Sequence, residues 1–127
     1  MASAVLDASA LLAHIRGERG SDPIADLAAD ALMSTVNLAE VFSRLMEESL
    51  TLEQADAIVL RYGMDVVPFD EELARGAGAL RPATKSLGLS LGDRACLALA
   101  QREGLPVLTA DRAWAKLAVG VEVKVIR

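Results

Sequence analysis

The stretch AVLDASALLA, residues 4–13, decides how this chain begins to fold. Ala4 to Leu6 form a short apolar run typical of a β-strand, and the apolar pattern resumes after Ser9 in the manner of a helix. Asp7 lies between the two. A carboxylate inside a hydrophobic segment must either lie where water reaches it or have a partner that offsets the cost of its desolvation. The stretch indicates a strand that turns into a helix, with an acid at the turn whose presence needs an explanation.

The same alternation of strand and helix continues along the chain. The segments that read as strands are Ala4–Leu6, Leu32–Thr35, Met64–Phe69, Pro106–Thr109 and Val121–Ile126. The first four are nearly continuous apolar runs, typical of strands buried on both faces of a parallel sheet, whereas the last alternates like an edge strand. Helical periodicity is seen at residues 38–46, 52–62, 73–80, 90–102 and 113–117, and residues 17–22 and 85–88 are expected loops. We predict one α/β domain over residues 1–127, with right-handed crossovers.

The composition limits the kind of function. Hydrophobic residues make up 53% of the 127 residues, many of them alanine, and the excess fits either a well-packed core or a surface for a partner chain. The net charge of −5 argues against binding nucleic acid by bulk attraction, so a polyanionic substrate would need a local basic patch or bridging cations. A single cysteine allows no internal disulfide, and we see neither a signal peptide nor a membrane span. We expect a cytoplasmic protein.

Four acidic residues follow or open predicted elements at the same edge of the expected sheet. Asp7 ends the first strand, Glu40 lies in NLAE after the second, Asp93 lies in SLGD at the start of the long apolar helix, and Asp111 follows the fourth strand in LTADRAW. The carboxyl ends of parallel strands and the starts of the following helices share one edge, which is where such folds bind ligands. These acids could therefore converge on one region.

Helix capping is the alternative explanation for each acid taken singly. Asp7 and Asp111 could be N-caps, while Asn37-x-x-Glu40 and Ser90-x-x-Asp93 resemble capping boxes. Glu40 also shares a helical stripe with Arg44 and Glu47, which fits a solvated face.

The position of Asp93 favours a shared site instead. It lies on the stripe of Leu97 and Ala100, which faces the protein. A second carboxylate there would repel Asp7, and a divalent cation would offset that repulsion far more than a helix N-terminus does. A set of carboxylates without useful cysteine or histidine ligands favours a hard ion such as Mg²⁺ or Mn²⁺. Our hypothesis is that Asp7 holds a metal.

These residues together resemble a known family. AVLDAS, STVNLAE, LSLGDRACLALA and LTADRAW are similar, in order and spacing, to the four acidic motifs of the PIN domain, in the version found in VapC-type toxins of bacterial toxin–antitoxin pairs. The resemblance runs nearly end to end. It implies a three-layer α/β/α sandwich with a mainly parallel five-stranded sheet.

The resemblance also implies an activity and a set of partners. PIN domains bind one or two Mg²⁺ or Mn²⁺ ions and hydrolyse phosphodiesters, usually in RNA, leaving a 5′-phosphate and a 3′-hydroxyl. Carried over, the catalytic and metal-binding residues would be Asp7, Glu40, Asp93 and Asp111. VapC-type relatives form homodimers and are inhibited by an antitoxin (VapB-like), whose tail lies in a groove; here residues 11–15 and 41–60 could form one.

Several neighbouring residues are candidates for supporting roles. The hydroxyls of Ser9 and Thr109 could hold metal-bound water or substrate, or could bond within the local turn. The basic residues near the acidic motifs are Arg81, Lys85, Arg94, Arg112 and Lys116, and each could contact phosphate or simply be solvated. We favour Arg94 and Arg112, because each directly follows a motif aspartate. Cys96 and Trp114 are expected to have packing roles, and His14 is expected either to lie at the surface or to pack.

Three other functions remain open at this point. The first is a PIN nuclease of RNA maturation or decay that has no antitoxin. The second is a receiver-like phospho-acceptor module with Asp70 as the acceptor, although the residues after Asp7 are Ala8 and Ser9 and the usual paired acid is missing. The third is a PIN scaffold that binds RNA without cutting it, which four intact acids argue against.

Overall fold

The computed structural model describes residues 1–126 and contains one five-stranded sheet. The strands are β1 (Ala4–Leu6), β2 (Ala31–Ser34), β3 (Asp65–Val67), β4 (Val107–Thr109) and β5 (Val123–Val125). Their order is β3-β2-β1-β4-β5, and every neighbouring pair is parallel. All five predicted strands are present, with ends that differ by at most two residues, and the sheet is wholly parallel within the described residues.

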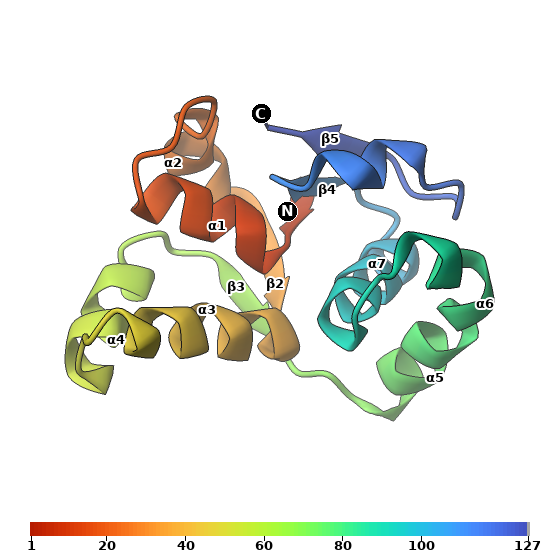
Figure 1. Cartoon of the computed structure of the whole chain (residues 1–127), viewed down its shortest axis with the longest axis horizontal. Helices are drawn as coiled ribbons and strands as arrows, with labels where there is room; N and C mark the ends of the chain where they lie inside the picture. Colours follow the sequence, from red (N-terminus) through yellow and green to blue (C-terminus); the bar gives the residue numbers. More distant parts are fainter. Residues whose placement is uncertain (127) are drawn as a thin grey trace.

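Helices connect the strands and lie on both sides of the sheet (Figure 1). They are α1 (Ala8–Ile15), α2 (Pro23–Leu27), α3 (Thr35–Glu47), α4 (Leu52–Leu60), α5 (Glu71–Ala79), α6 (Arg81–Thr84) and α7 (Leu91–Glu103). Short 3₁₀ helices occur at Ala28–Asp30, Lys85–Leu87 and Arg112–Lys116. No helix among residues 1–126 combines the length and the apolar character needed to cross a bilayer.

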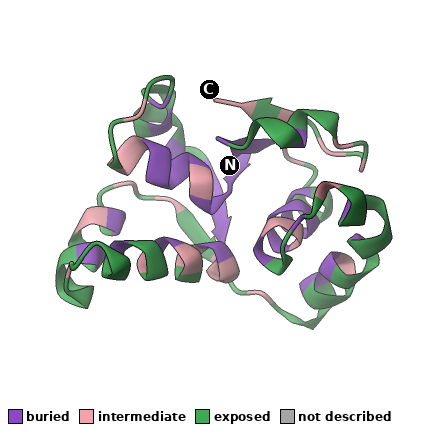
Figure 2. Cartoon of the chain, viewed as in Figure 1, coloured by how far each residue is buried: buried purple, intermediate pink, exposed green. Residues whose placement is uncertain are grey.

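Two separate hydrophobic cores show that the sheet is the middle layer of three. Leu6 of β1 packs with Leu11 of α1 and Leu45 of α3 in one core, whereas its neighbour Val5 packs with Leu97 of α7 in the other. Successive residues of a strand point to opposite faces, so these assignments place α1 to α4 on one face and α5 and α7 on the other. The predicted α/β/α sandwich is confirmed, and Figure 2 shows buried residues concentrated in β1 and β2.

One strand differs from its predicted environment. We expected Met64–Phe69 to be buried on both faces, but Asp65 and Val66 of β3 are exposed and Val67 is only half-buried. The reason is its position at the edge of the sheet, next to β2 alone. The strand order, and not the apolar run, decides its burial. The alternating strand β5 is the opposite edge, as predicted.

Several short helices lie outside the predicted pattern, among them α2 and the 3₁₀ turn at residues 85–87. Residues 17–22 form the expected loop, but the helix α2 that follows was not predicted, although Pro23 stands at its start, where proline is favoured. Residues 85–87 form a 3₁₀ turn that ends at Gly88, whose φ of 66° suits glycine.

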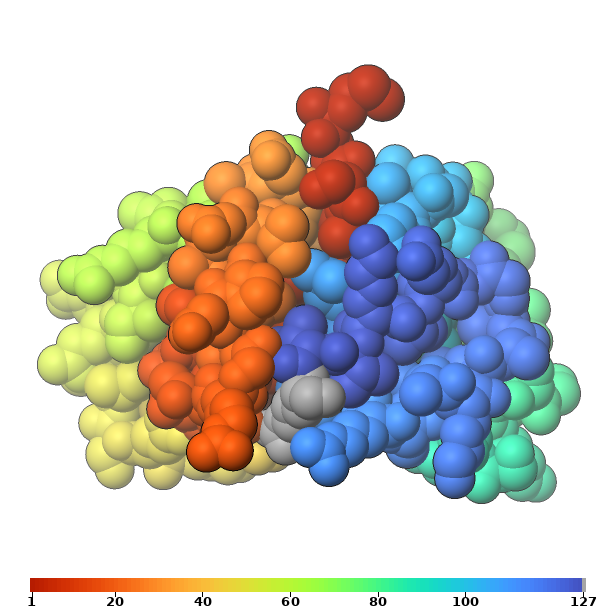
Figure 3. Space-filling view, turned by 90° about the horizontal axis from the view of Figure 1, so that it is seen from above, coloured from red at the N-terminus to blue at the C-terminus, as the bar shows by residue number. Residues whose placement is uncertain are grey.

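Seen from above, the first residues of the chain project from the surface between the orange segment around α2 and the blue C-terminal segments (Figure 3).

Candidate active site

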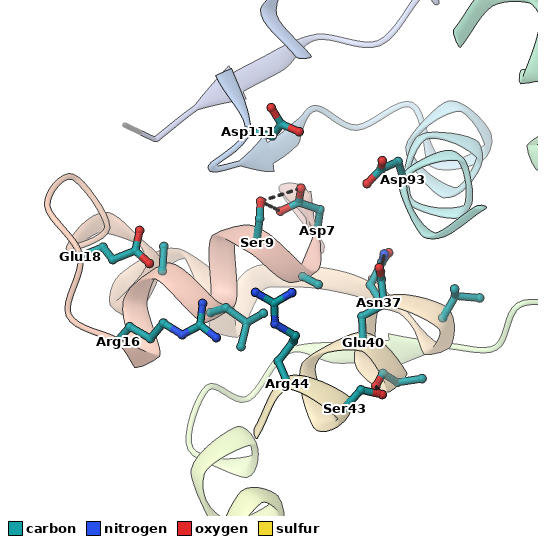
Figure 4. Close-up of a pocket in the computed structure, with 15 residues that line it drawn as sticks. Asp7, Ser9, Arg16, Glu18, Asn37, Glu40, Ser43, Arg44, Asp93 and Asp111 are labelled. Carbon is teal, nitrogen blue, oxygen red and sulfur yellow. Dashed lines mark hydrogen bonds between the residues drawn. The ribbon is translucent and has the colours of Figure 1, made fainter. Parts of the chain in front are cut away.

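All four predicted acids line one pocket at the carboxyl edge of the sheet. The pocket has a volume of about 580 Å³, and we call it the acidic pocket. Its polar lining residues are Asp7, Ser9, Arg16, Glu18, Asn37, Glu40, Ser43, Arg44, Asp93 and Asp111 (Figure 4). The acids come from the end of β1, from α3, from the first turn of α7 and from the end of β4, so the fold gathers parts of the sequence that lie up to a hundred residues apart.

Asp7 lies deepest in this site, with 4% of its surface exposed. It caps α1 by accepting a hydrogen bond from the Ala10 amide at 2.8 Å. The Ser9 hydroxyl donates to its two oxygens at 2.8 and 2.9 Å, and the Thr109 hydroxyl donates at 2.5 Å. Burial raises the pKa of Asp7 to about 6, although these hydrogen bonds lower it in part, and the charge of Asp93 raises it further.

Ser9 and Thr109 also join β1 to β4. The Ala110 amide donates to the Ser9 hydroxyl at 2.9 Å, and the Asp111 amide donates to the Thr109 hydroxyl at 3.1 Å. The two hydroxyls are themselves 3.2 Å apart. The bonds from these hydroxyls therefore reach the Asp7 carboxylate and the backbone around Asp111, beyond the local turn.

Glu40 does not belong to a capping box, so that alternative is wrong. The helix α3 begins at Thr35, and its cap is Ser34, whose hydroxyl accepts from the Val36 amide at 3.2 Å. The Asn37 side-chain amide instead donates to Glu40 Oε1 at 2.7 Å and to the Gly92 carbonyl at 3.0 Å. These bonds place the Glu40 carboxylate against the start of α7.

Asp93 and Asp111 do cap helices, as the alternative predicted. Asp93 and Ser90 form a capping box: the Ser90 amide donates to Asp93 Oδ2 at 2.9 Å, and the Asp93 amide donates to the Ser90 hydroxyl at 3.2 Å. Asp111 Oδ1 accepts from the Ala113 amide at 3.0 Å. Each cap uses one carboxylate oxygen, and the second oxygen of each makes no hydrogen bond within residues 1–126.

The pKa of the buried cysteine near the pocket is raised by the charges of three of the acids. Cys96 of α7 is fully buried, as predicted, and its thiol pKa is raised well above its usual value, first by burial and then by the charges of Asp7, Asp93 and Glu40. The charges of three carboxylates thus all reach the same buried thiol.

His14 packs edge to face on Tyr62, with a hydrogen bond of 2.7 Å, and Trp114 is buried, so both have the packing roles predicted for them.

The acids fit a divalent cation by chemistry and location, but their side chains are not preassembled around one. Across residues 1–126, no three Asp, Glu, His or Cys side chains stand in a ready metal-binding arrangement. The donors at the pocket are oxygens, which a hard ion prefers, and Glu40, Asp93 and Asp111 each keep one oxygen outside the hydrogen bonds described above. A bound cation would require side-chain movements that bring those oxygens together.

Of the two basic residues that we favoured, only Arg112 lies beside the site. Arg94 donates to the Ala77 carbonyl at 3.0 Å and so ties α7 to α5, outside the acidic pocket. Arg112 is exposed and lines a second hollow that shares Ser9 and Asp111 with the acidic pocket. Three further candidates, Arg81, Lys85 and Lys116, are exposed and line neither hollow.

Two arginines that sequence reasoning did not single out line the acidic pocket. Arg16 follows α1 and bonds Glu48 at 3.0 and 3.1 Å, while Arg44 lies one turn after Glu40 on α3 and has only a 3.9 Å ion pair with Glu47. Figure 4 shows both guanidinium groups on the side of the pocket opposite Asp93 and Asp111. The spacing of Arg44 from Glu40, at i+4, was the available signal.

Comparison with known families accounts for this arrangement. The PIN domain model matches residues 4–120. The chain belongs to the PIN domain family. This is a family of nucleases, so hydrolysis is the class of chemistry expected at the acidic pocket. A search of curated protein sequences found no match for this PIN domain.

Solved structures of similar fold come from toxin–antitoxin complexes. The DNA-bound VapBC from Salmonella typhimurium is 21% identical with a TM-score of 0.78, covering 100% of both chains. VapBC-5 from Mycobacterium tuberculosis is 26% identical with a TM-score of 0.60, covering 100% of this chain and 99% of that one. VapBC-1 from nontypeable Haemophilus influenzae is 16% identical with a TM-score of 0.71, covering 95% and 96%.

The receiver-like alternative does not survive these findings. Asp70, its supposed acceptor, caps α5 by accepting from the Leu73 amide at 2.9 Å and pairs with Arg102 at 3.0 Å. Hydrogen bonding to Leu73 and then to Arg102 lowers the pKa of Asp70. It is not among the residues of the acidic pocket.

Proposed function

We propose that this PIN domain is a Mg²⁺- or Mn²⁺-dependent endoribonuclease and the toxin of a toxin–antitoxin pair. The observation that carries the proposal is the gathering of Asp7, Glu40, Asp93 and Asp111 on one pocket at the carboxyl edge of the sheet. PIN domains generally use divalent metal ions. The overall charge of −5 makes a cation the natural bridge between this pocket and a polyanion.

The four acids would hold the cation. When bound, the ion supplies a water of lowered pKa and neutralises charge on the phosphate. Asp7 is the central ligand, because Ser9 and Thr109 fix both of its oxygens. Glu40, Asp93 and Asp111 present their second oxygens from three other elements.

The RNA phosphates would lie between the acids and the arginines. Arg44 and Arg16 lie across the pocket from Asp93 and Asp111, and Arg112 lines the adjoining hollow. Arginine side chains in these places orient a phosphodiester without carrying base specificity. If water attacks phosphorus and the 3′-oxygen leaves with a proton, the products are a 5′-phosphate and a 3′-hydroxyl, as the resemblance to PIN domains implies.

The partners follow from the similar complexes. VapBC assemblies pair a toxin with an antitoxin, and we assign a VapB-like antitoxin to this chain on that likeness. The homodimeric state and the cytoplasmic location that we propose rest on the resemblance to VapC-type toxins. A PIN nuclease of RNA maturation or decay is the second candidate, favoured by the family match taken alone. A small antitoxin gene directly upstream would distinguish the two.

RNA cleavage tests the activity. The purified chain, free of antitoxin, is incubated with total RNA in Mg²⁺, Mn²⁺ or EDTA, beside Asp7→Asn and Asp93→Asn. We expect defined fragments only with metal and only from the unmodified chain, with a loss of at least 10–100-fold in each variant. Cutting in EDTA, or equal cutting by the variants, would refute the assignment, and binding without cutting would identify an RNA-binding scaffold.

A further inference from the structure

The carboxylate of Glu40 occupies the space that a side chain at position 92 would fill. A Cβ placed on Gly92 would lie 2.6 Å from Cδ of Glu40 and 2.7 Å from its Oε2, and nearer still to Oε1. Real Cβ atoms essentially never come within 3.0 Å of such neighbours, so an alanine at position 92 would displace the flexible end of the Glu40 side chain. Gly92 is buried in the first turn of α7 and its φ is not positive, so backbone conformation does not explain the glycine. The close approach of Glu40 does.

Asn37 fixes the other side of the same contact. Its side-chain amide donates to Glu40 Oε1 and to the Gly92 carbonyl, so one NH₂ group joins α3, Glu40 and α7. Asn37 is 1% exposed, and its Oδ1 has no hydrogen-bond partner in the described chain. Leaving the buried Oδ1 of Asn37 without a partner is unfavourable. The two hydrogen bonds from the NH₂ group therefore hold the Asn37 side chain in this orientation in spite of that cost.

We propose that Asn37 and Gly92 are positioning residues for Glu40, and that they hold its carboxylate at the start of α7, within the acidic pocket that Asp93 also lines, for binding the divalent cation. The contact puts a negative side chain at the start of α7, where the helix dipole favours it. It also brings Glu40 against the residue before Asp93 in the chain, and both acids line the acidic pocket. The role in cation binding rests on the proposed function; the contact itself does not.

A double-mutant cycle separates positioning from mere packing of α3 on α7. The proteins are the unmodified chain, Gly92→Ala, Glu40→Ala and the double variant. Gly78→Ala is the matched control, because a Cβ at that helical glycine meets no atom within 4 Å. Mn²⁺ affinity is measured by isothermal titration calorimetry, and Tm is measured in EDTA.

The two measurements have definite expected results. Gly92→Ala should weaken Mn²⁺ binding at least tenfold in the chain with Glu40 and leave it unchanged in the Glu40→Ala background. In EDTA it should lower Tm only where Glu40 is present. Gly78→Ala should leave Mn²⁺ affinity unchanged. Asn37→Ala should likewise weaken Mn²⁺ binding only in the chain that retains Glu40.

The outcomes that contradict the proposal are distinct. Equal effects of Gly92→Ala on Tm with and without Glu40 would overturn the contact. Coupled Tm effects with unchanged Mn²⁺ affinity would overturn its role in positioning. If the unmodified chain binds no Mn²⁺, the proposed metal-dependent function fails, and with it the purpose assigned to Glu40, while the Tm cycle still reports the contact.

Discussion

Asp7 shows that the fold accepts an unfavourable buried carboxyl group in the acidic pocket. It is almost wholly buried, and burial outweighs three hydrogen bonds, so its pKa rises to about 6. A buried carboxyl with a raised pKa makes the folded state less stable at neutral pH. In the proposed account a bound cation removes this penalty, which explains an acid inside the first apolar segment.

The pH dependence of stability tests this view of Asp7. Its folded pKa of about 6 exceeds the unfolded value of 3.8, so between these values the folded state binds the extra proton and stability falls as pH rises. The loss approaches about 3 kcal/mol by neutral pH. Urea unfolding in EDTA at pH 4.5 and 7.5 should show this fall in the unmodified chain and a smaller one in Asp7→Asn. Parallel pH dependences in the two proteins would contradict it.

At the scale of single residues, the sequence predicted the acids because strand ends and helix starts share an edge. It could not decide between capping and a shared site, because the structure combines both: Asp7, Asp93 and Asp111 cap helices while lining one pocket. A cap uses one carboxylate oxygen and leaves the other available. The two explanations were therefore not exclusive.

At the scale of elements, the start of α7 carries two separable functions. Ser90 and Asp93 close its capping box, and Asp93 also faces the acidic pocket. Gly92, between them, leaves room for Glu40 from α3. The first turn of this helix thus links helix stability to the geometry of the site.

Two substitutions should separate these functions. Ser90→Ala removes the hydroxyl that accepts from the Asp93 amide, and we expect it to lower the unfolding free energy by about 1 kcal/mol with RNA cleavage retained. Asp93→Asn keeps an oxygen for the Ser90 amide, so stability in EDTA should be little changed while cleavage is lost. Urea unfolding and the cleavage assay are run on both. The reverse pattern would make Asp93 a cap and nothing more.

Burial of the strands depended on information that the local sequence lacks. β1 and β4 are buried as their apolar runs predicted, but β3 is exposed because it lies at the edge of the sheet. Strand order follows from the crossovers of the whole chain, and a run of apolar residues does not encode it. The same limit explains why α2, with only five residues, was missed.

At the scale of the whole molecule, the acidic pocket contains both negative and positive side chains, an arrangement that the net charge does not reveal. Asp93 and Asp111 lie on one side of it and the guanidinium groups of Arg16 and Arg44 on the other, within a chain of net charge −5. These arginines were not predicted, because their approach to the acids depends on how the ends of α1 and α3 pack together. The favoured Arg94 packs instead against the backbone of α5.

Arg44→Ala should weaken RNA binding, measured with Asp7→Asn in the background to prevent cleavage. We expect the slope of log affinity against log salt concentration to fall by roughly one unit, as for one lost phosphate contact. Arg75→Ala is the matched control, since Arg75 is an exposed arginine paired with Glu71 at 2.7 Å and lies outside the pocket. Identical slopes for the two variants would remove Arg44 from the RNA site.

The proposed metal-dependent function requires that one cation is shared by carboxylates from four elements of the fold. Crystals soaked in Mn²⁺ and measured near the manganese absorption edge test this directly through anomalous scattering. We predict a peak inside the acidic pocket, in contact with Asp7 and Asp93, that disappears in Asp7→Asn. A soaked crystal of the unmodified chain with no peak there, or with Mn²⁺ bound only elsewhere, would contradict the central claim.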